Sequence, residues 1–170
     1  MRKVLTALLV LAAMVVVTGC GLADKVAEKA VEKATGVTVD EKKNTVTLQG
    51  QNGEKVTVTT ETEGKLPAGF PLPVYPQAKV SNGGKIDVSG KAMYTVELTY
   101  KGDIKPAVDF YEKALKDKGL ADFFKAETAN DDEEESWTMS GQNEKATAAI
   151  FFQTMKKTKE AKIAISWTEK

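Results

Sequence analysis

Aromatic residues occur only in the later part of this sequence, and their distribution decides where a core can form. All twelve Phe, Trp and Tyr residues lie between Phe70 and Trp167. Aromatic side chains supply much of the buried area of a folded core. We therefore expect the main globular domain at 66–170 and a thinner, less stable element before it, at 37–65.

The composition excludes several classes of function. The 170 residues include 24 Lys and Arg against 24 Asp and Glu, no His and one Cys. A formal charge of zero lacks the basic field of a nucleic-acid-binding protein. Without His there is no imidazole acid–base catalysis, no Ser–His or Cys–His nucleophile and no His-ligated zinc. We expect no nucleic-acid partner, no cofactor, no metal site and no catalytic residues.

The N-terminus has the layout of a secretory signal peptide. Met1-Arg2-Lys3 is basic, and Val4–Val17 is an apolar run of 14 residues interrupted only by Thr6. This run is shorter than the roughly 20 residues that a transmembrane helix needs. We expect residues 1–19 to be removed as a signal peptide.

Val17-Thr18-Gly19-Cys20 resembles the lipobox of bacterial lipoproteins. In that family the cysteine carries a diacylglycerol on sulfur, the signal is cut before it, and the new α-amine is often acylated with a chain such as palmitate. The resemblance implies anchoring in membrane lipid through acylated Cys20. The alternative is an ordinary thiol at the end of a signal or membrane segment.

Cleavage before Cys20 leaves 151 of the 170 residues, with 22 basic and 24 acidic side chains and a net charge of about −2. Such a chain has no free thiol and no disulfide, which fits an extracytoplasmic protein stabilised by its core alone. Because Gly21 and not Asp follows the cysteine, resemblance to sorted lipoproteins implies the outer membrane in a two-membrane bacterium. In a single-membrane cell the protein is expected on the outer leaflet of the plasma membrane.

Residues 20–36 contain the cysteine and a short charged helix. A four-residue repeat places Leu22, Val26, Ala30 and Ala34 near one helical face, and Gly36 follows as a C-terminal cap. We expect a solvated stalk that spaces the domain from lipid. The alternative is a helix that binds a partner or the membrane surface.

Residues 37–65 are expected to form a small β meander and a linker. Apolar residues alternate with Thr in Val37–Val39, Thr45–Leu48 and Val56–Thr59, and Asn52-Gly53 is a hairpin signal. With so few large apolar residues, the meander is not expected to be stable alone. It should pack on the larger domain or on a partner.

A proline-rich segment leads into the main domain. Leu66–Pro76 holds four of the five prolines, which favours extended, polyproline-like chain. It has its own apolar anchors, so we expect a rigid strap over the core; they are Phe70, Leu72, Val74 and Tyr75. The alternative is a ligand for a proline-recognition domain.

The remaining chain predicts an α+β fold with an antiparallel sheet and one main helix. The helix runs from Asp103, the expected N-cap, to Lys118, with Gly119 closing it, and its apolar stripe should cover the sheet. Short strands linked by hairpins then give a two-layer sandwich. The expected strand segments are Lys79–Val80, Ile86–Val88, Tyr94–Tyr100, Phe123–Ala126, Ser136–Met139, Thr147–Thr154 and Lys162–Thr168.

Several patterns together resemble a family of uncharacterised small bacterial lipoproteins. They are the lipobox at Cys20, the Glu32–Gly36 helix end, the Thr-rich meander, the Phe70–Pro76 lead-in and the Phe110-Tyr-Glu-Lys-Ala-Leu stretch of the main helix. Leu120 stands where relatives often have Trp. Domains of this family have no assigned function, so the resemblance implies no reaction and no catalytic residues.

Two polar patterns have a chemical and a structural interpretation. Asp131–Glu135 is a dense acidic run, but it lacks the spaced ligands and internal Gly of a calcium loop, so a solvated hairpin tip is favoured. Ser81 and Ser89 lie near Lys85 and Lys91 without the Ser-x-x-Lys spacing of a hydrolase. Both pairs are interpreted as turns.

The pairs Phe123-Phe124 and Phe151-Phe152 suggest an interaction surface. Neighbouring residues on a strand point to opposite faces, so one member of each pair faces away from the helix-covered core. We take Phe124 and Phe152 as the candidate surface residues. That second face is either covered by the lead-in and meander or exposed for binding.

These patterns favour a non-enzymatic, lipid-anchored lipoprotein of the bacterial envelope with an interaction or envelope-maintenance role. The alternative is a module that binds a small apolar ligand or inhibits an enzyme, and an enzyme is the third possibility. An apolar pocket with converging polar groups favours the ligand module, whereas a flat exposed aromatic face favours a protein partner.

Overall fold

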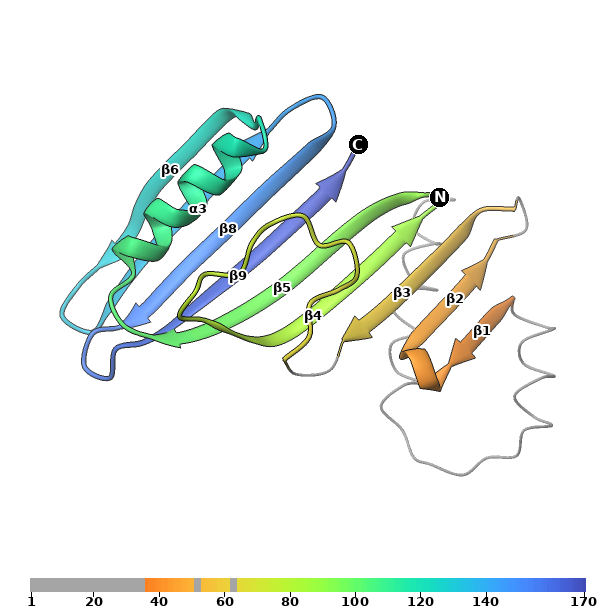
Figure 1. Ribbon diagram of the computed structural model, residues 1–170, viewed down its shortest axis with the longest axis horizontal. Coiled ribbons are helices and arrows are strands. Elements are labelled where there is room, and N and C mark those ends of the chain that lie inside the picture. The colour runs from red at the N-terminus through yellow and green to blue at the C-terminus, as the bar shows by residue number, and fades with distance from the viewer. Residues whose placement is uncertain (1–35, 51–52, 62–63) are drawn as a thin grey trace, which may run out of the picture. The chain divides into compact units, whose positions relative to one another are not determined.

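The computed structural model describes residues 36–50, 53–61 and 64–170 of the chain. The signal segment, Cys20 and the helix predicted at 22–34 lie outside the described residues. The described chain forms one nine-stranded antiparallel sheet in the order β1-β2-β3-β4-β5-β9-β8-β7-β6 (Figure 1). Its elements are β1 (Val37–Asp40), the 3-10 helix η1 (Glu41–Lys43), β2 (Thr45–Gln49), β3 (Lys55–Glu61), β4 (Lys79–Val88), β5 (Lys91–Lys101), α3 (Lys105–Asp117), β6 (Ala121–Asn130), β7 (Glu134–Gln142), β8 (Ala146–Met155) and β9 (Glu160–Glu169).

The α+β class predicted from the sequence is wrong, because the described chain is largely β. The meander does not pack on the main sheet as a separate layer. Instead, β3 pairs along β4, with Val56 opposite Val88 and Glu61 opposite Gly83. A strand at a sheet edge carries unpaired backbone N–H and C=O groups, and pairing with β4 satisfies those of β3. Residues 37–65 and 66–170 thus share one sheet.

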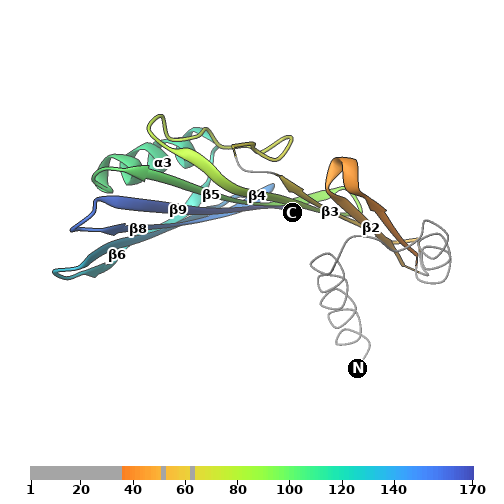
Figure 2. The same cartoon turned by 90° about the horizontal axis from the view of Figure 1, so that it is seen from below.

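One face of the sheet carries the core, and we call it the inner face. Side chains along β5 alternate strictly between buried and exposed positions, and those along β8 and most of β9 alternate between buried and more exposed positions. Register places Leu98 beside Ile163 and Ile163 beside Phe152, all fully buried. α3 packs on this face, as Figure 2 shows edge-on, and Tyr111 is fully buried beneath it. We call the opposite face the outer face.

The main helix forms where the sequence predicts it, but it begins differently. The N-cap position is Ile104, with no side-chain cap, and the Asp103 carboxylate instead accepts a hydrogen bond from Lys159 Nζ at 2.7 Å. Asp103 as N-cap is therefore wrong. Pro106 occupies the first turn, where its missing N–H is not needed. Gly119, with φ of +70°, follows the end of the helix.

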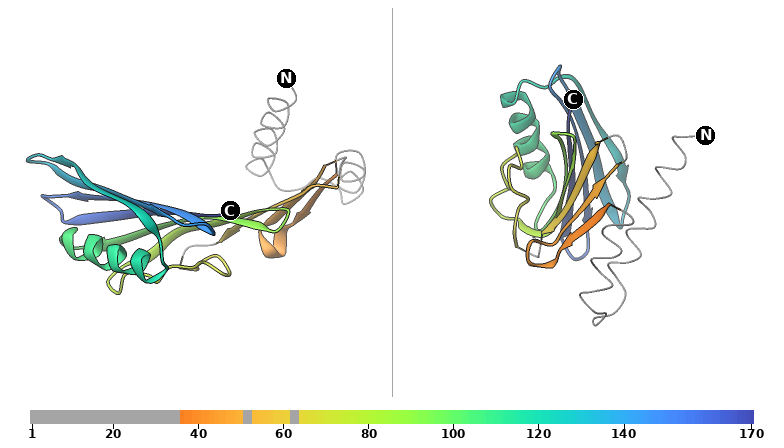
Figure 3. Two further views of the ribbon diagram at one scale, coloured as in Figure 1. Left: turned by 90° about the horizontal axis from the view of Figure 1, so that it is seen from above. Right: turned by 90° about the vertical axis from the view of Figure 1, so that its right-hand side faces the viewer.

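The proline-rich segment lies over the inner face, on the same side as α3 (Figures 1 and 3), as the sequence predicts. The backbone N–H of Tyr75 donates a hydrogen bond to the Tyr111 hydroxyl at 3.2 Å, and burial raises the pKa of that hydroxyl. A Cβ added at Gly83 would meet the Pro67 ring at 3.0 Å. Gly83 therefore lets the segment approach β4 closely.

The apolar side chains of β4 lie on one face of the sheet before Ser81 and on the other face after it. Val80 lies opposite Leu98, but Asn82 lies opposite Glu97, so Ser81 is an extra residue in the ladder. This is a β-bulge. The Ser81 hydroxyl donates a hydrogen bond to the backbone oxygen of Glu97 at 3.1 Å. Val80 consequently faces the inner side with Leu98.

Beyond the bulge, the apolar residues of β4 lie on the outer face. Ile86 pairs with Val58 on one side and with Met93 on the other, and Met93 is 40% exposed. The same parity continues through β1 to β3, whose Val and Leu side chains lie on the outer face. Apart from Thr60, their Thr side chains lie on the inner face, where Thr45 and Thr59 share a hydroxyl hydrogen bond of 3.2 Å. The two ends of the sheet therefore present their apolar side chains on opposite faces.

Substitution of the paired phenylalanines of β8 tests which of them belongs to the core. Phe152→Ala removes a fully buried ring, and we expect it to lower the free energy of unfolding by about 3–5 kcal/mol. Phe151 is 42% exposed, so Phe151→Ala should cost less than about 1 kcal/mol. Urea unfolding of both variants measures the difference. Equal losses would contradict the observed side-chain parity.

An ion cluster on α3 predicts the pH dependence of stability. Glu112 accepts hydrogen bonds from Lys116 Nζ at 2.6 Å and from Lys125 Nζ on β6, and these bonds lower its pKa from the usual 4.5 to about 2. A depressed carboxyl pKa stabilises the fold above pH 4.5, and this stability is lost as pH falls toward 2.

Glu112→Gln should therefore flatten the acid limb of the plot of unfolding free energy against pH. The Glu112 side chain is 23% exposed, so the loss at neutral pH should stay below about 1 kcal/mol. Lys125→Met removes one of the two amines and should flatten the same limb less. An unchanged limb in Glu112→Gln would show that the cluster does not contribute.

Candidate functional site

The structure separates the two residues that the sequence proposes as a surface. Phe124 lies on the outer face and is 54% exposed. Phe152 is buried on the inner face, 6.0 Å from the Tyr111 ring between centroids, and it pairs across strands with Trp137 and Ile163. Assigning Phe152 to the surface is therefore wrong, because β8 register turns it toward α3.

Phe151 takes the outer position on β8 and lies near Phe124. It pairs with Thr138 of β7, which pairs with Ala126 of β6. Phe124 pairs with Ser140, two residues along β7 from Thr138, and Ser140 pairs with Ala149. We call this block of two rows on three strands the aromatic patch; its members are Phe124, Ala126, Thr138, Ser140, Ala149 and Phe151.

The chemistry of the aromatic patch suits contact with another surface. Two exposed rings rise from Ala, Ser and Thr side chains, and the patch contains no titratable group. Such a patch can bury aromatic area against a complementary surface, but it offers no acid, base or nucleophile.

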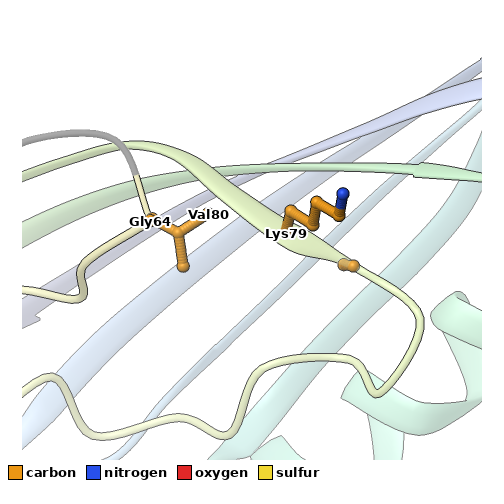
Figure 4. A pocket seen from close by; sticks show the side chains of 4 residues that line it. Gly64, Lys79 and Val80 are labelled. Atoms are coloured by element: carbon orange, nitrogen blue, oxygen red, sulfur yellow. The ribbon is translucent and has the colours of Figure 1, made fainter.

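Two surface depressions lie away from the aromatic patch. One is lined by Gly64, Ala78, Lys79 and Val80, where the Gly64 N–H bonds to the Val80 oxygen (Figure 4). The other is lined by Lys55, Thr57, Thr59, Lys85 and Asp87 on β3 and β4. The first depression has only two apolar side chains, Ala78 and Val80, and the second has none, so neither is the mostly apolar pocket that encloses a small apolar ligand.

The acidic run forms a hairpin tip between β6 and β7. Asp131 Oδ1 accepts hydrogen bonds from the backbone N–H of Glu133 at 2.9 Å and of Glu134 at 2.8 Å. These two bonds lower the pKa of the Asp131 carboxyl. Lys156 donates to Asn130 Oδ1 at 2.6 Å and so ties the tip to β8 and β9. The acidic run Asp131–Glu135 is therefore part of the β6–β7 turn, as the sequence predicts.

The Ser and Lys pairs are also parts of turns and strands. Ser81 forms the β4 bulge, and its hydroxyl bonds to the Glu97 backbone. Ser89, with φ of +52°, lies in the β4–β5 turn, and the neighbouring Gly90 N–H bonds to Asp87 Oδ1. Lys85 instead lies over the Tyr94 ring at 5.5 Å.

Neither a metal centre nor a membrane span is found in the described part of the chain. There, no three His, Cys, Asp or Glu side chains are grouped closely enough to hold a metal ion. Within the same residues, no helix combines the length and the apolar character needed to cross a bilayer.

No protein-family model, curated protein or solved structure matches the chain.

Sequence reasoning missed Phe151, although a signal was present. On β8 the outer set, which contains Phe151, also contains Thr147 and Gln153, whereas the inner set contains Ile150 and Phe152. Residues two apart on a strand lie on the same face, so the polar Gln153 indicates that Phe151 lies on the solvent-facing side of β8. Comparison of the two sets would have assigned the rings correctly.

Proposed function

We propose that this protein is a lipid-anchored, non-enzymatic module of the bacterial envelope that binds a protein partner through the aromatic patch. The observation that carries the proposal is the exposure of Phe124 and Phe151, at 54% and 42%, on a sheet face that lies opposite α3. Large exposed rings on one patch are typical of interaction sites. The lipobox at Cys20 supports the anchor.

The geometry favours a protein partner over a small ligand. Phe124 and Phe151 stand on different strands with β7 between them, so both are covered together only by an extended surface. Aromatic anchors of this kind often dominate the energy of protein interfaces. The two depressions described above lie elsewhere and are lined mainly by small or polar residues.

Lipid anchoring has a direct chemical test. Intact mass of the protein purified from its native membrane should show loss of residues 1–19 and the addition of two or three acyl chains at Cys20. Such chains, at about 0.8 kcal/mol per buried methylene, hold a protein on a bilayer. Cys20→Ser should lose both the added mass and the cleavage. An unmodified Cys20 would contradict the anchor.

Partner binding is tested by substituting the rings. We expect Phe151→Ser and Phe124→Ser each to reduce crosslinking to a membrane partner by at least about tenfold, the effect of losing about 1.4 kcal/mol of binding energy. Mild crosslinking in native membranes, followed by affinity capture and mass spectrometry, measures it.

Leu66→Ser is the matched control, since Leu66 is an exposed apolar residue (36%) in the proline-rich segment and not in the aromatic patch. It should leave the crosslinked partner unchanged. Loss of the partner in all three variants, or in none, would contradict binding through the aromatic patch.

A further inference from the structure

The proline-rich segment has a burial pattern that repeats every third residue over residues 71–76. Leu72 and Tyr75 are 3% and 8% exposed, whereas Pro73 and Pro76 are exposed and the other two residues are half-buried. A polyproline II helix has about three residues per turn, so residues three apart lie on one edge of it. The segment therefore turns one edge to the core and another to the solvent. We call the edge that contains Pro73 and Pro76 the proline ridge.

The covalent structure of the segment favours this conformation. The three prolines at 71, 73 and 76 hold φ at about −65°, and the residue before each proline is restricted to the β or polyproline II region. Among residues 70–76, only Val74 is subject to neither restriction. The proline ridge is thus set largely by its own sequence.

The core holds the opposite edge of the segment. The Tyr75 ring lies 5.2 Å from the Tyr100 ring and 5.5 Å from the Phe110 ring between centroids. The Tyr75 N–H donates to the Tyr111 hydroxyl. Because these contacts already order the segment, a partner that binds the proline ridge spends little binding energy on ordering it.

The chemistry of the proline ridge indicates what binds it. No charged residue occurs from Leu66 to Ala78, and proline has no N–H group. Within the described residues, the carbonyl oxygens of Pro73, Val74 and Pro76 accept no hydrogen bond. The ridge therefore presents apolar rings and free carbonyl acceptors. Trp and Tyr side chains are complementary to it, because each joins a flat apolar ring to a hydrogen-bond donor.

We propose that the proline ridge is a second docking site, which binds a protein partner through a groove lined with Trp and Tyr side chains. Aromatic grooves of this kind recognise preformed polyproline II segments. Packing on the core and docking are compatible, since they use different edges of the segment. The segment lies on the α3 side of the sheet, as Figure 2 shows, and the aromatic patch lies on the outer face, so this inference does not rest on binding by the aromatic patch.

Photocrosslinking of the full chain in its native membranes tests this inference. Gln77, an exposed residue next to the proline ridge, is replaced by p-benzoylphenylalanine, and mass spectrometry identifies the crosslinked peptide of the partner. Decaproline, which adopts the polyproline II conformation, is the competitor. A flexible Gly-Ser peptide of equal length is the control for it.

We expect a crosslinked protein whose attached peptide contains Trp or Tyr. Pro73→Ala and Pro76→Ala should each lower the yield at least about fivefold, because each removes a ring that fills the groove. Excess decaproline should lower the yield similarly, and the Gly-Ser peptide should not.

Pro106→Ala is the matched control. It removes an exposed proline from the first turn of α3, outside the proline ridge, and should leave the yield unchanged. All three substituted prolines are exposed, so the core should remain intact in each variant, and circular dichroism checks this.

Unchanged yields in Pro73→Ala and Pro76→Ala would overturn the inference, as would an equal loss in Pro106→Ala. Resistance of the crosslink to decaproline would also overturn it. So would the absence of a crosslinked protein, or a product that joins two copies of this chain.

The aromatic-patch variant Phe151→Ser separates the two docking sites. It should leave the Gln77 crosslink unchanged, and Pro73→Ala should leave the partner of the aromatic patch unchanged. If Phe151→Ser abolishes the Gln77 crosslink while the proline variants keep it, the contact belongs to the partner of the aromatic patch, and the inference is overturned.

Discussion

The β-bulge at Ser81 determines how this molecule divides its apolar surface. One extra residue in β4 turns Val80 toward α3 and turns Ile86 and Val88 to the opposite face. The Val and Leu side chains of β1 to β3 lie on the same face as Ile86, because strand register fixes the face of each side chain. A continuous sheet thus carries a packed core on one face of one end and an aliphatic surface on the other face of the other end.

This arrangement explains how a single α-helix suffices for a sheet of nine strands in the described part of the chain. α3 and the proline-rich segment cover the inner face over the aromatic-rich strands, where Leu98, Phe152 and Ile163 are fully buried. Opposite that core, the outer face carries the aromatic patch, and beyond the bulge it carries the Val, Leu and Ile side chains of β1 to β4. The outer face therefore carries apolar side chains at both ends of the sheet, and this arrangement agrees with the proposed interaction module.

The sequence predicts the local elements well because their signals are local. Val108, Tyr111 and Leu115 recur at helical spacing and mark α3, while alternation from Tyr94 to Tyr100 marks β5. Pairing of β3 with β4 was not predictable in the same way, since backbone hydrogen bonds leave no side-chain pattern. A bulge of one residue likewise has no clear signature, and it reverses every face assignment beyond it. Of the two proposed surface residues, Phe124 is exposed as predicted, but Phe152 is buried. Phe151 and Phe152 are equally apolar, and only the polar Gln153 distinguishes the faces on which they lie.

The most direct test of this account is a methyl nuclear Overhauser measurement on the Ile86 side chain. Register places Ile86 between Val58 and Met93 on the outer face, with Lys85 directed to the Tyr94 ring on the inner face. We expect strong Ile86 cross-peaks to the methyl groups of Val58 and Met93 and none to the Tyr94 ring. Cross-peaks from Ile86 to Tyr94, with none to Met93, would show that β4 has no face-switching bulge and would contradict the account.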